Sequence, residues 1–344
     1  MSEPSRAPSR VPAEWEAREG TLLAWPPEHV FPGARAEVVD TFRALIRLLR
    51  GCEKVTLLVP PDERDAIARS LGGEDESLEL EPLLVNDVWT RDSGPICAEQ
   101  TGPEGTEAVF LDGGFNGWGA KYPHEMDRLI PTLLSRRYGV RRVSLPIALE
   151  GGAVEVNGRG DLLTTESVLL NPNRHNPERD VVERELRRHF GAERVHWLGR
   201  GLAGDDTDGH IDNLARFVAP GRIACPTGDL PSGHPDAETL ARNRRALASL
   251  HTAQGPAEVI ELPAANVTDR RGRRLPASYA NFYLAPGLVI APTFGENADD
   301  RALGILRELF PERRVAGLEA RPLLAEGGAF HCITQPLRRT ANAP

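Results

Sequence analysis

The segment GAVEVNGRGDLLTTESVLL (residues 152–170) contains two short apolar runs that are separated by Asn157, Gly158 and Gly160. Asn-Gly pairs favour the tight turns that join antiparallel strands, so this segment predicts a β-hairpin. Similar stretches follow at residues 214–226, with a turn at Pro220-Gly221, and at residues 282–292, with a turn at Pro286-Gly287. Hairpins that recur at intervals of roughly sixty residues indicate a repeated structural unit.

A helical pattern and a strand-like run accompany each of these hairpins. The pattern is clearest where Val38, Phe42, Leu45 and Leu49 recur at helical spacing. Helical patterns begin near Pro32, His124, Pro177, Pro235 and Ala298, and the strand-like runs after them cover residues 55–59, 142–146, 195–198, 259–262 and 315–318. The sequence therefore predicts a unit of hairpin, helix and strand that is repeated five times.

The two ends of the chain each carry a single strand-like run, at residues 21–25 and 330–334. Pairing these runs would complete the fifth hairpin and leave no open sheet edge. We therefore predict a fivefold pseudosymmetric α/β propeller, as one domain over residues 13–340 after a flexible tail at residues 1–12. The alternative is a doubly wound sheet of single strands alternating with helices, but hairpins are hard to place in a parallel sheet.

Composition narrows the classes of function. Of the 344 residues, 40% are hydrophobic and 26% charged, and the net charge of −9 does not fit a nucleic-acid-binding surface. We expect no membrane span, because no apolar run approaches the roughly 18 residues that a span needs. Cys52, Cys97, Cys225 and Cys332 lie far apart, which is typical of free thiols in a cytoplasmic protein without a secretory signal.

Four polar segments each open a new unit of the repeat. They cover residues 89–95, 149–152, 205–213 and 326–332. Equivalent positions of a fivefold propeller surround one axis, so residues far apart in the sequence can meet there. We expect the convergent side chains to be Asp92, Glu150, His210, Asp212 and Cys332.

This set of side chains fits chemistry on a guanidinium group. Asp92 and Asp212 can hold the planar cation by charge-assisted hydrogen bonds. The thiolate of Cys332 can attack the central carbon. His210 can protonate the departing ammonia and then activate water, while Glu150 fixes the orientation of the histidine.

Taken singly, each of these residues has a structural explanation, since an aspartate at a turn is usually a cap and a cysteine in a strand is usually core. Alternation along a strand would turn His331 away from Cys332 and Arg91 away from Asp92. Arg91 would then simply close a salt bridge. The hypothesis of a site depends on five suitable groups at equivalent places of the repeat.

Two other motifs point to different chemistry. The segment GRGLAG (residues 199–204) matches a dinucleotide-binding pattern, but Asp205 and Asp206 follow where a helix should begin, so we interpret the match as chance. An EF-hand loop with its glycine at Gly209 would place its first and last ligands at Gly204 and Ala215, neither of which can bind calcium through its side chain. A metal-dependent hydrolase that uses residues 205–212 remains an alternative.

The segments resemble the agmatine deiminase family, which includes bacterial peptidyl-arginine deiminases and belongs to the guanidino-group-modifying enzymes of the pentein fold. The similarity runs from about Trp15 to Pro336 and is carried by residues 89–95, 115–119 (FNGWG), 171–174 (NPNR), 208–213 (DGHIDN) and 331–335 (HCITQ).

The resemblance implies a role for each residue of the set. Cys332 would be the nucleophile, His210 the general acid and base, Asp92 and Asp212 the guanidinium ligands, and Glu150 a support for the site. We further expect Trp89, Trp118 and Asp206 to contact the substrate. The resemblance also implies no metal, no cofactor, and conversion of agmatine to N-carbamoylputrescine and ammonia through a covalent cysteine thiouronium intermediate.

The sequence departs from the family pattern in two places. Ala329 stands where a glycine is expected before the cysteine, and the stretch from Trp118 to Leu129 is short. Hydrolysis or amidino transfer on arginine, peptidyl-arginine or another guanidine therefore stays open, as does a non-catalytic propeller that binds a cation. The oligomeric state is also open, with a homodimer as one option.

Overall fold

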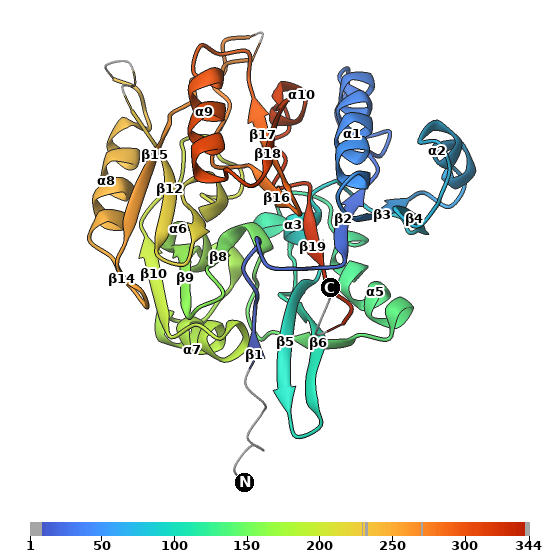
Figure 1. Ribbon diagram of the computed structural model, residues 1–344, viewed down its shortest axis with the longest axis horizontal. Coiled ribbons are helices and arrows are strands. Elements are labelled where there is room, and N and C mark those ends of the chain that lie inside the picture. Colours follow the sequence, from blue (N-terminus) through green and yellow to red (C-terminus); the bar gives the residue numbers. More distant parts are fainter. Residues whose placement is uncertain (1–8, 229, 231–232, 270, 341–344) are drawn as a thin grey trace.

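Five sheets of three or four strands surround a common centre in the computed structural model, which describes residues 9–228, 230, 233–269 and 271–340 (Figure 1). The helices α1, α5, α7, α8 and α9 lie at the outer rim, one beside each sheet. The predicted fivefold α/β propeller is therefore confirmed. No helix in the described part of the chain is long and apolar enough to cross a bilayer.

Each blade repeats one order of elements. In the third blade, β8 (Val154–Val156) pairs antiparallel with β9 (Asp161–Thr165), and after α7 (Arg179–Phe190) the strand β10 (Arg194–Leu198) pairs parallel with β9. The same order recurs in three further blades: β5 (Ile96–Gly102), β6 (Gly105–Asp112), α5 (Ile130–Tyr138) and β7 (Arg141–Ser144); β11 (Arg216–Ala219), β12 (Arg222–Thr227), α8 (Ala237–Ala248) and β15 (Glu258–Pro263); β16 (Tyr283–Ala285), β17 (Leu288–Thr293), α9 (Asp299–Leu309) and β18 (Arg314–Glu319).

The remaining blade is built from both ends of the chain. β19 (Gln335–Leu337) pairs antiparallel with β2 (Gly20–Ala24), which pairs parallel with β3 (Lys54–Val59) after α1 (Arg35–Arg50). The predicted closure is confirmed, but the strand predicted over residues 330–334 is wrong. These residues form a turn, in which the N–H of Thr334 donates to the carbonyl oxygen of His331 (3.2 Å) and the hydroxyl of Thr334 donates to that of Phe330 (2.7 Å).

The helices bury the faces that their sequence pattern predicts. In α1, the side chains of Val38, Phe42, Leu45 and Leu49 are buried. The pattern missed the hairpin of β5 and β6, and it missed α2 (Arg64–Ser70) and β4 (Leu78–Pro82), which extend the closing blade.

The folded part of the chain begins nearer to the N-terminus than expected. β1 (Ser9–Arg10) pairs with β5, and the backbone N–H of Val11 donates to Phe190 (3.1 Å). The flexible tail expected over residues 1–12 is thus wrong for residues 9–12, and residues 1–8 lie outside the described part.

Five short turns precede the first strands of the blades and form a closed ring. They are α3 (Thr90–Ser93), η2 (Gly151–Ala153), η4 (Ile211–Asn213), the turn at residues 278–281 and the turn at residues 331–334. Hydrogen bonds link four of the five neighbouring pairs: Gly152 N to Asp92, Ser278 to Asn213 O, His331 N to Asn281, and Arg91 N to Cys332 O. In the fifth pair, Gly152 of η2 packs against the side chain of His210 at the start of η4. Every blade therefore contributes one turn to the same place.

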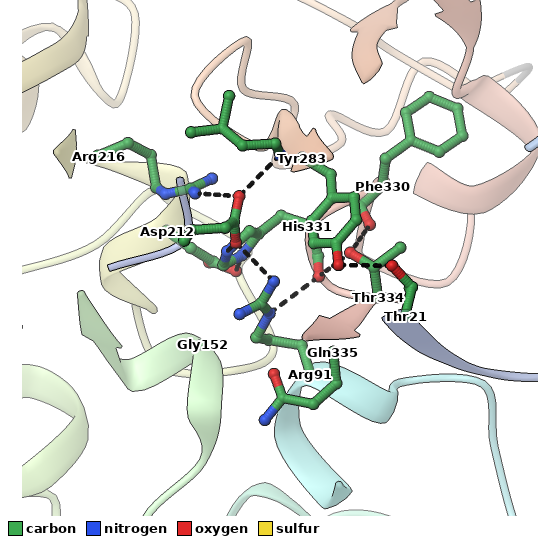
Figure 2. A network of polar contacts seen from close by, with 12 residues as sticks. Thr21, Arg91, Gly152, Asp212, Arg216, Tyr283, Phe330, His331, Thr334 and Gln335 are labelled. Carbon is green, nitrogen blue, oxygen red and sulfur yellow. Dashed lines mark hydrogen bonds and ion pairs between the residues drawn. The ribbon is translucent and has the colours of Figure 1, made fainter. Parts of the chain in front are cut away.

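A buried carboxylate, Glu14, holds the middle of this ring. Its side chain is 7% exposed and accepts hydrogen bonds from Arg91 Nη2 (2.8 Å) and Arg216 Nη2 (2.9 Å). It also contacts His331 Nε2 (3.0 Å) and accepts from the N–H of Leu284 (2.8 Å). Figure 2 shows Arg91, Arg216 and His331 converging from different blades. Burial alone would raise the pKa of Glu14, but the charges of Arg216, His331 and Arg91 hold it well below its usual range.

We expect Glu14→Ala to destabilise the protein by about 3–5 kcal/mol, because it leaves two buried guanidinium groups without their shared anion. The matched control is Asp40→Ala, which removes an ion pair to Arg43 from a side chain that is 75% exposed. Urea unfolding at neutral pH measures both variants. A Glu14→Ala protein as stable as Asp40→Ala would show that Glu14 does not hold the blades together.

Candidate active site

A cavity of about 570 Å³ leads from the surface to the thiol of Cys332. Cys332 is 5% exposed and lies in the turn before β19. Asp92, Trp89 and Trp118 line the same cavity, as does Asp206 near its mouth. Four of the expected substrate-binding residues and the expected nucleophile therefore line one cavity. Asp212 lies behind the thiol, with its Oδ2 atom 3.6 Å from Cys332 Sγ.

Gly152 marks the point where the other expected residues meet. A Cβ atom at this position would lie 2.5 Å from His210 Nδ1, 2.8 Å from Asp92 Oδ1 and 3.2 Å from Asp212 Oδ2. Only glycine leaves room for these three side chains, and its N–H donates to Asp92 Oδ1 (3.0 Å). Three of the five side chains that were expected to converge, Asp92, His210 and Asp212, therefore meet at Gly152.

Asp92 is oriented by two N–H donors. Besides Gly152, the indole Nε1 of Trp118 donates to Asp92 Oδ2 (2.9 Å). Trp118 itself adopts a left-handed backbone conformation (φ 54°) between two glycines, Gly117 and Gly119, so the loop is bent to aim the indole. Burial, together with the nearby charge of Asp212, raises the pKa of Asp92 to about 6.

Asp212 is anchored from behind by His331. The Nδ1 atom of His331 lies 2.7 Å from Asp212 Oδ2, and its Nε2 atom lies 3.0 Å from Glu14 Oε2. Although burial opposes it, the hydrogen bond and charge of His331 lower the pKa of Asp212. The strand on which His331 was expected to point away from Cys332 is absent, because residues 330–334 form a turn. The imidazole nevertheless points to Asp212 and Glu14 and does not line the cavity.

Arg91 is also set in a turn rather than a strand, in α3. Its guanidinium points to Glu14 and to the carbonyl oxygen of His331 (3.2 Å), and not into the cavity. The expected salt bridge is confirmed, although it results from the helical turn and not from strand alternation.

His210 is fully buried among carboxylates. Its Nδ1 atom lies 3.6 Å from Asp92 Oδ1, and both ring nitrogens lack hydrogen-bond partners among the described residues. Burial acts to lower its pKa, but the charges of Asp92, Glu150 and Asp212 outweigh burial and raise it. The carboxylates around this imidazole therefore stabilise its protonated form.

Glu150 is bound by Arg174, a residue that the sequence analysis did not single out. Arg174 is fully buried, and its Nε donates to Glu150 Oε1 (2.7 Å) while its other nitrogens donate to the carbonyl oxygens of Trp118 (3.1 Å) and Thr207 (2.9 Å). Within the described residues Glu150 makes no hydrogen bond to His210, and its Oε2 has no partner. The segment NPNR could have indicated Arg174, since only an arginine can join so many acceptors.

The thiol of Cys332 is in an environment that disfavours the thiolate. Burial, and then the charges of Asp212 and Asp92, raise its pKa well above the usual range. The amide Nδ2 of Asn281 donates to its sulfur (3.1 Å). Asn281 was also missed, although the fivefold repeat could have found it: its turn is the fifth member of the ring, and only four were considered.

The mouth of the cavity carries both signs of charge. Asp206, which accepts from the hydroxyl of Tyr122 (2.8 Å), lines it together with Asp87 and Glu326. Burial raises the pKa of Asp87 to about 7. Arg273 and Arg274 line the cavity too, but they pair with Asp269 and Asp236.

The two competing motifs have structural explanations. A Cβ at Gly201 would lie 2.0 Å from the Cα of Gly209, so the glycines of GRGLAG let two loops touch, and the pattern is not followed by a long helix. The carboxylates of residues 205–212 turn to different partners: Asp205 to Thr207, Asp206 to Tyr122, Asp208 to Lys121 and Arg174, and Asp212 to His331. They do not converge as metal ligands would.

The chain matches known proteins over almost its whole length. The family described as Porphyromonas-type peptidyl-arginine deiminase covers residues 10–337. A Streptomyces avermitilis protein named "Putative agmatine deiminase" is 37% identical, covering 97% of this chain and 99% of its own.

Solved structures share the fold. An agmatine deiminase of Enterococcus faecalis is 26% identical with a TM-score of 0.88, covering 99% of this chain and 100% of its own. A C. jejuni agmatine deiminase variant with substrate bound is 26% identical with a TM-score of 0.86, covering 99% of each chain.

We expect the thiol of Cys332 to react slowly with iodoacetamide at neutral pH and about tenfold faster for each unit of rising pH, because only the thiolate attacks and its pKa is raised. Peptide mass spectrometry follows alkylation of Cys332 between pH 6 and pH 9.5. In the urea-unfolded control the midpoint should fall near an ordinary value of about 8.5. A rate that is already at its plateau at pH 7 in the folded protein would contradict the protonated thiol.

Proposed function

This chain belongs to the Porphyromonas-type peptidyl-arginine deiminase family, and from that premise we propose that it hydrolyses the guanidinium group of agmatine to N-carbamoylputrescine and ammonia. Relatives named for agmatine deiminase activity, one of them solved with substrate bound, support an enzyme that acts on guanidino groups. The four free cysteines are consistent with a thiol enzyme working in the cytoplasm.

The observation that carries the proposal is a set of buried acceptors that lack donors beside a buried thiol. Glu150 Oε2 and Asp212 Oδ1 have no hydrogen-bond partner among the described residues. An unpaired buried acceptor costs about 1–3 kcal/mol, and the cost is recovered when a donor arrives. A guanidinium is planar and positively charged, and it carries hydrogen-bond donors but no acceptors. It therefore matches this set of acceptors better than a substrate whose own acceptors would need donors from the protein.

The first half of the proposed reaction forms a bond between sulfur and carbon. The bound cation offsets the negative field of Asp92 and Asp212 at the sulfur, so the thiol loses its proton to water in the cavity that opens at Cys332. The thiolate then attacks the central guanidinium carbon. His210 then gives its proton to one amino group, the C–N bond breaks, and ammonia leaves. An S-alkylthiouronium group remains on Cys332.

The second half restores the enzyme. His210, now neutral, removes a proton from a water molecule that attacks the same carbon. The C–S bond breaks with the electron pair returning to sulfur, and the proton on the new oxygen passes to that sulfur. The product leaves as a substituted urea. The sum is one water consumed and one ammonia released.

The charges at the mouth of the cavity favour a substrate with a second cation. Asp87, Asp206 and Glu326 face the far end of an extended substrate whose guanidinium lies at Cys332. Arg274 is paired with Asp236, and Arg273 is 71% exposed and paired with Asp269, so neither arginine is a buried cation free for a carboxylate. An arginine substrate would bring its carboxylate close to these three acids, and both arginines already have carboxylate partners.

We expect Cys332→Ala to abolish turnover of agmatine, with ammonia release reduced to background, because no other group can form the covalent bond. Binding of agmatine, measured by calorimetry, should persist, since Glu150 and Asp212 remain. Cys225→Ala is the matched control: this buried thiol lies in β12, away from the cavity, and its loss should leave turnover unchanged. Substantial activity of purified Cys332→Ala would remove the cysteine mechanism.

We expect kcat/KM for agmatine to exceed that for free arginine by about 100-fold or more, because the two differ by a carboxylate that this mouth repels. Parallel steady-state assays of ammonia release at neutral pH measure the ratio, with peptidyl-arginine as a third substrate. Equal or better turnover of arginine would leave the thiol chemistry intact but would overturn the assignment of agmatine.

A further inference from the structure

His331 precedes the proposed nucleophile in the sequence, yet no step of the proposed reaction uses it. Its side chain is 1% exposed and lies between two buried carboxylates. The Nδ1 atom is 2.7 Å from Oδ2 of Asp212, and the Nε2 atom is 3.0 Å from Oε2 of Glu14. Figure 2 shows the imidazole beside Asp212. The number of protons on this imidazole therefore affects the charge that the site presents to a substrate.

The contacts of Glu14 require a proton on Nε2 of His331. Oε1 of Glu14 accepts from Arg216 Nη2 (2.9 Å) and from the N–H of Leu284 (2.8 Å), and Oε2 accepts from Arg91 Nη2 (2.8 Å). All three of these groups donate and cannot accept, so Glu14 matches them as a carboxylate ion. A carboxylate ion offers no proton, so its contact with Nε2 is a hydrogen bond only if that nitrogen donates.

The contact with Asp212 requires a second proton, on Nδ1. Although burial acts to raise it, the hydrogen bond and charge of His331 lower the pKa of Asp212, and the charges of His210 and Arg216 act in the same direction. Two acceptors without a proton between them would repel each other at 2.7 Å, so Nδ1 donates to an ionised Asp212. With protons on both nitrogens, the imidazole of His331 is a cation.

The charged surroundings of this pair favour a cation on the imidazole. The other charged and titratable groups that act on Asp212 or contact His331 are Glu14, Asp92, Glu155, Asp205, Arg91, Arg216, His210 and Cys332. Carboxylates outnumber arginines in this set, even before Asp212 itself is counted. An additional positive charge on His331 offsets part of this excess.

The charge of His331 matters because the other oxygen of Asp212 is available to a substrate. Oδ1 of Asp212 has no partner among the described residues, and the proposed reaction gives it a guanidinium to bind. A protonated Asp212 would be neutral and would bind a guanidinium more weakly than a carboxylate ion does. Asp212 is fully buried, and burial without a neighbouring cation raises the pKa of a carboxyl group.

We propose that His331 is a positioning residue, held as an imidazolium cation between Glu14 and Asp212, which keeps Asp212 ionised and its free oxygen available to the guanidinium. The inference rests on the proposed guanidinium chemistry, but it does not depend on agmatine being the substrate. It also gives Glu14 a second task, because the proton that Glu14 holds on Nε2 distinguishes the cation from a neutral imidazole.

The test measures the dissociation constant of agmatine by calorimetry between pH 6.5 and pH 8.5, in a Cys332→Ala background that cannot turn it over. His331→Asn places an amide N–H near the position of Nδ1, so it keeps a donor to Asp212 but removes the cation. Relative to the Cys332→Ala parent, we expect the double variant to lose about 10-fold more affinity at pH 6.5 than at pH 8.5, because a proton then competes with the guanidinium for Asp212.

The ratio of the two dissociation constants separates charge from structure. A purely structural defect would weaken binding by the same factor at every pH. Asp92 and His210 are present in both proteins, so their own titration largely cancels in the ratio. If His331→Asn does not fold, His331→Gln replaces it, with its amide directed to Glu14 instead, and we expect the same dependence on pH.

His196→Asn in the same background is the matched control. His196 also contacts a buried carboxylate, Asp161 (3.0 Å), but it lies in β10 and outside the cavity. Its dissociation constant for agmatine should equal that of the Cys332→Ala parent at each pH.

NMR of the wild type with ¹⁵N-labelled histidine counts the protons on His331 without any substrate. We expect the signals that disappear in the His331 variant to come from two protonated nitrogens at neutral pH, whereas a neutral imidazole has one protonated and one bare nitrogen. A bare nitrogen on His331, or a ratio of dissociation constants that does not change with pH, would overturn the proposal. Two protonated nitrogens in a protein that does not bind agmatine would support the cation on His331 and overturn agmatine as the substrate.

Discussion

The contact of Glu14 with Arg91, Arg216 and His331 is the constraint on which the rest of the structure depends. Five blades that meet around an axis bring backbone turns and polar side chains to the centre, where an apolar core could not satisfy them. Two buried guanidinium groups are tolerable there only because Glu14 and Glu155 balance them. The other ring nitrogen of His331 contacts Asp212, so the position of this site carboxylate depends on the contacts at the centre of the ring.

The fold orients the polar side chains of the site but leaves several of their buried atoms without hydrogen-bond partners among the described residues. Its carboxylates are oriented by fixed donors on one side, Trp118 and Gly152 for Asp92, Arg174 for Glu150 and His331 for Asp212. On the other side, two oxygens and both nitrogens of His210 lack partners among the described residues. Such preorganisation costs stability in the free protein, and the cost is repaid when a planar cation binds. Burial and the excess of carboxylates over cations in the site also raise the pKa values of Asp92 and Cys332.

The sequence could predict the parts of this account that repeat. Turn residues at Asn157-Gly158 and helical spacing in α1 predict the blade, and equivalence of the blades predicts that Asp92, His210, Asp212 and Cys332 meet. It could not predict that residues 330–334 form a turn, since Phe330, Ile333 and Thr334 are residue types that favour strands. In the structure, the N–H of Thr334 donates to the carbonyl oxygen of His331 and its hydroxyl to that of Phe330. Nor could it identify Glu14 and Arg174 as partners of the site residues, because their contacts depend on how the ring closes. Glu14 and His331, for example, are 317 residues apart in the sequence.

The central claim is that the bond between the guanidinium carbon and Cys332 forms during turnover. Mass spectrometry of protein quenched with acid while it consumes agmatine tests it most directly, because acid protonates His210 and stops hydrolysis of the adduct. The account predicts a population of protein heavier by the mass of agmatine less ammonia, with the added mass on the peptide that contains Cys332. Ammonia release at full rate with only unmodified Cys332 peptide at every quench time would contradict it.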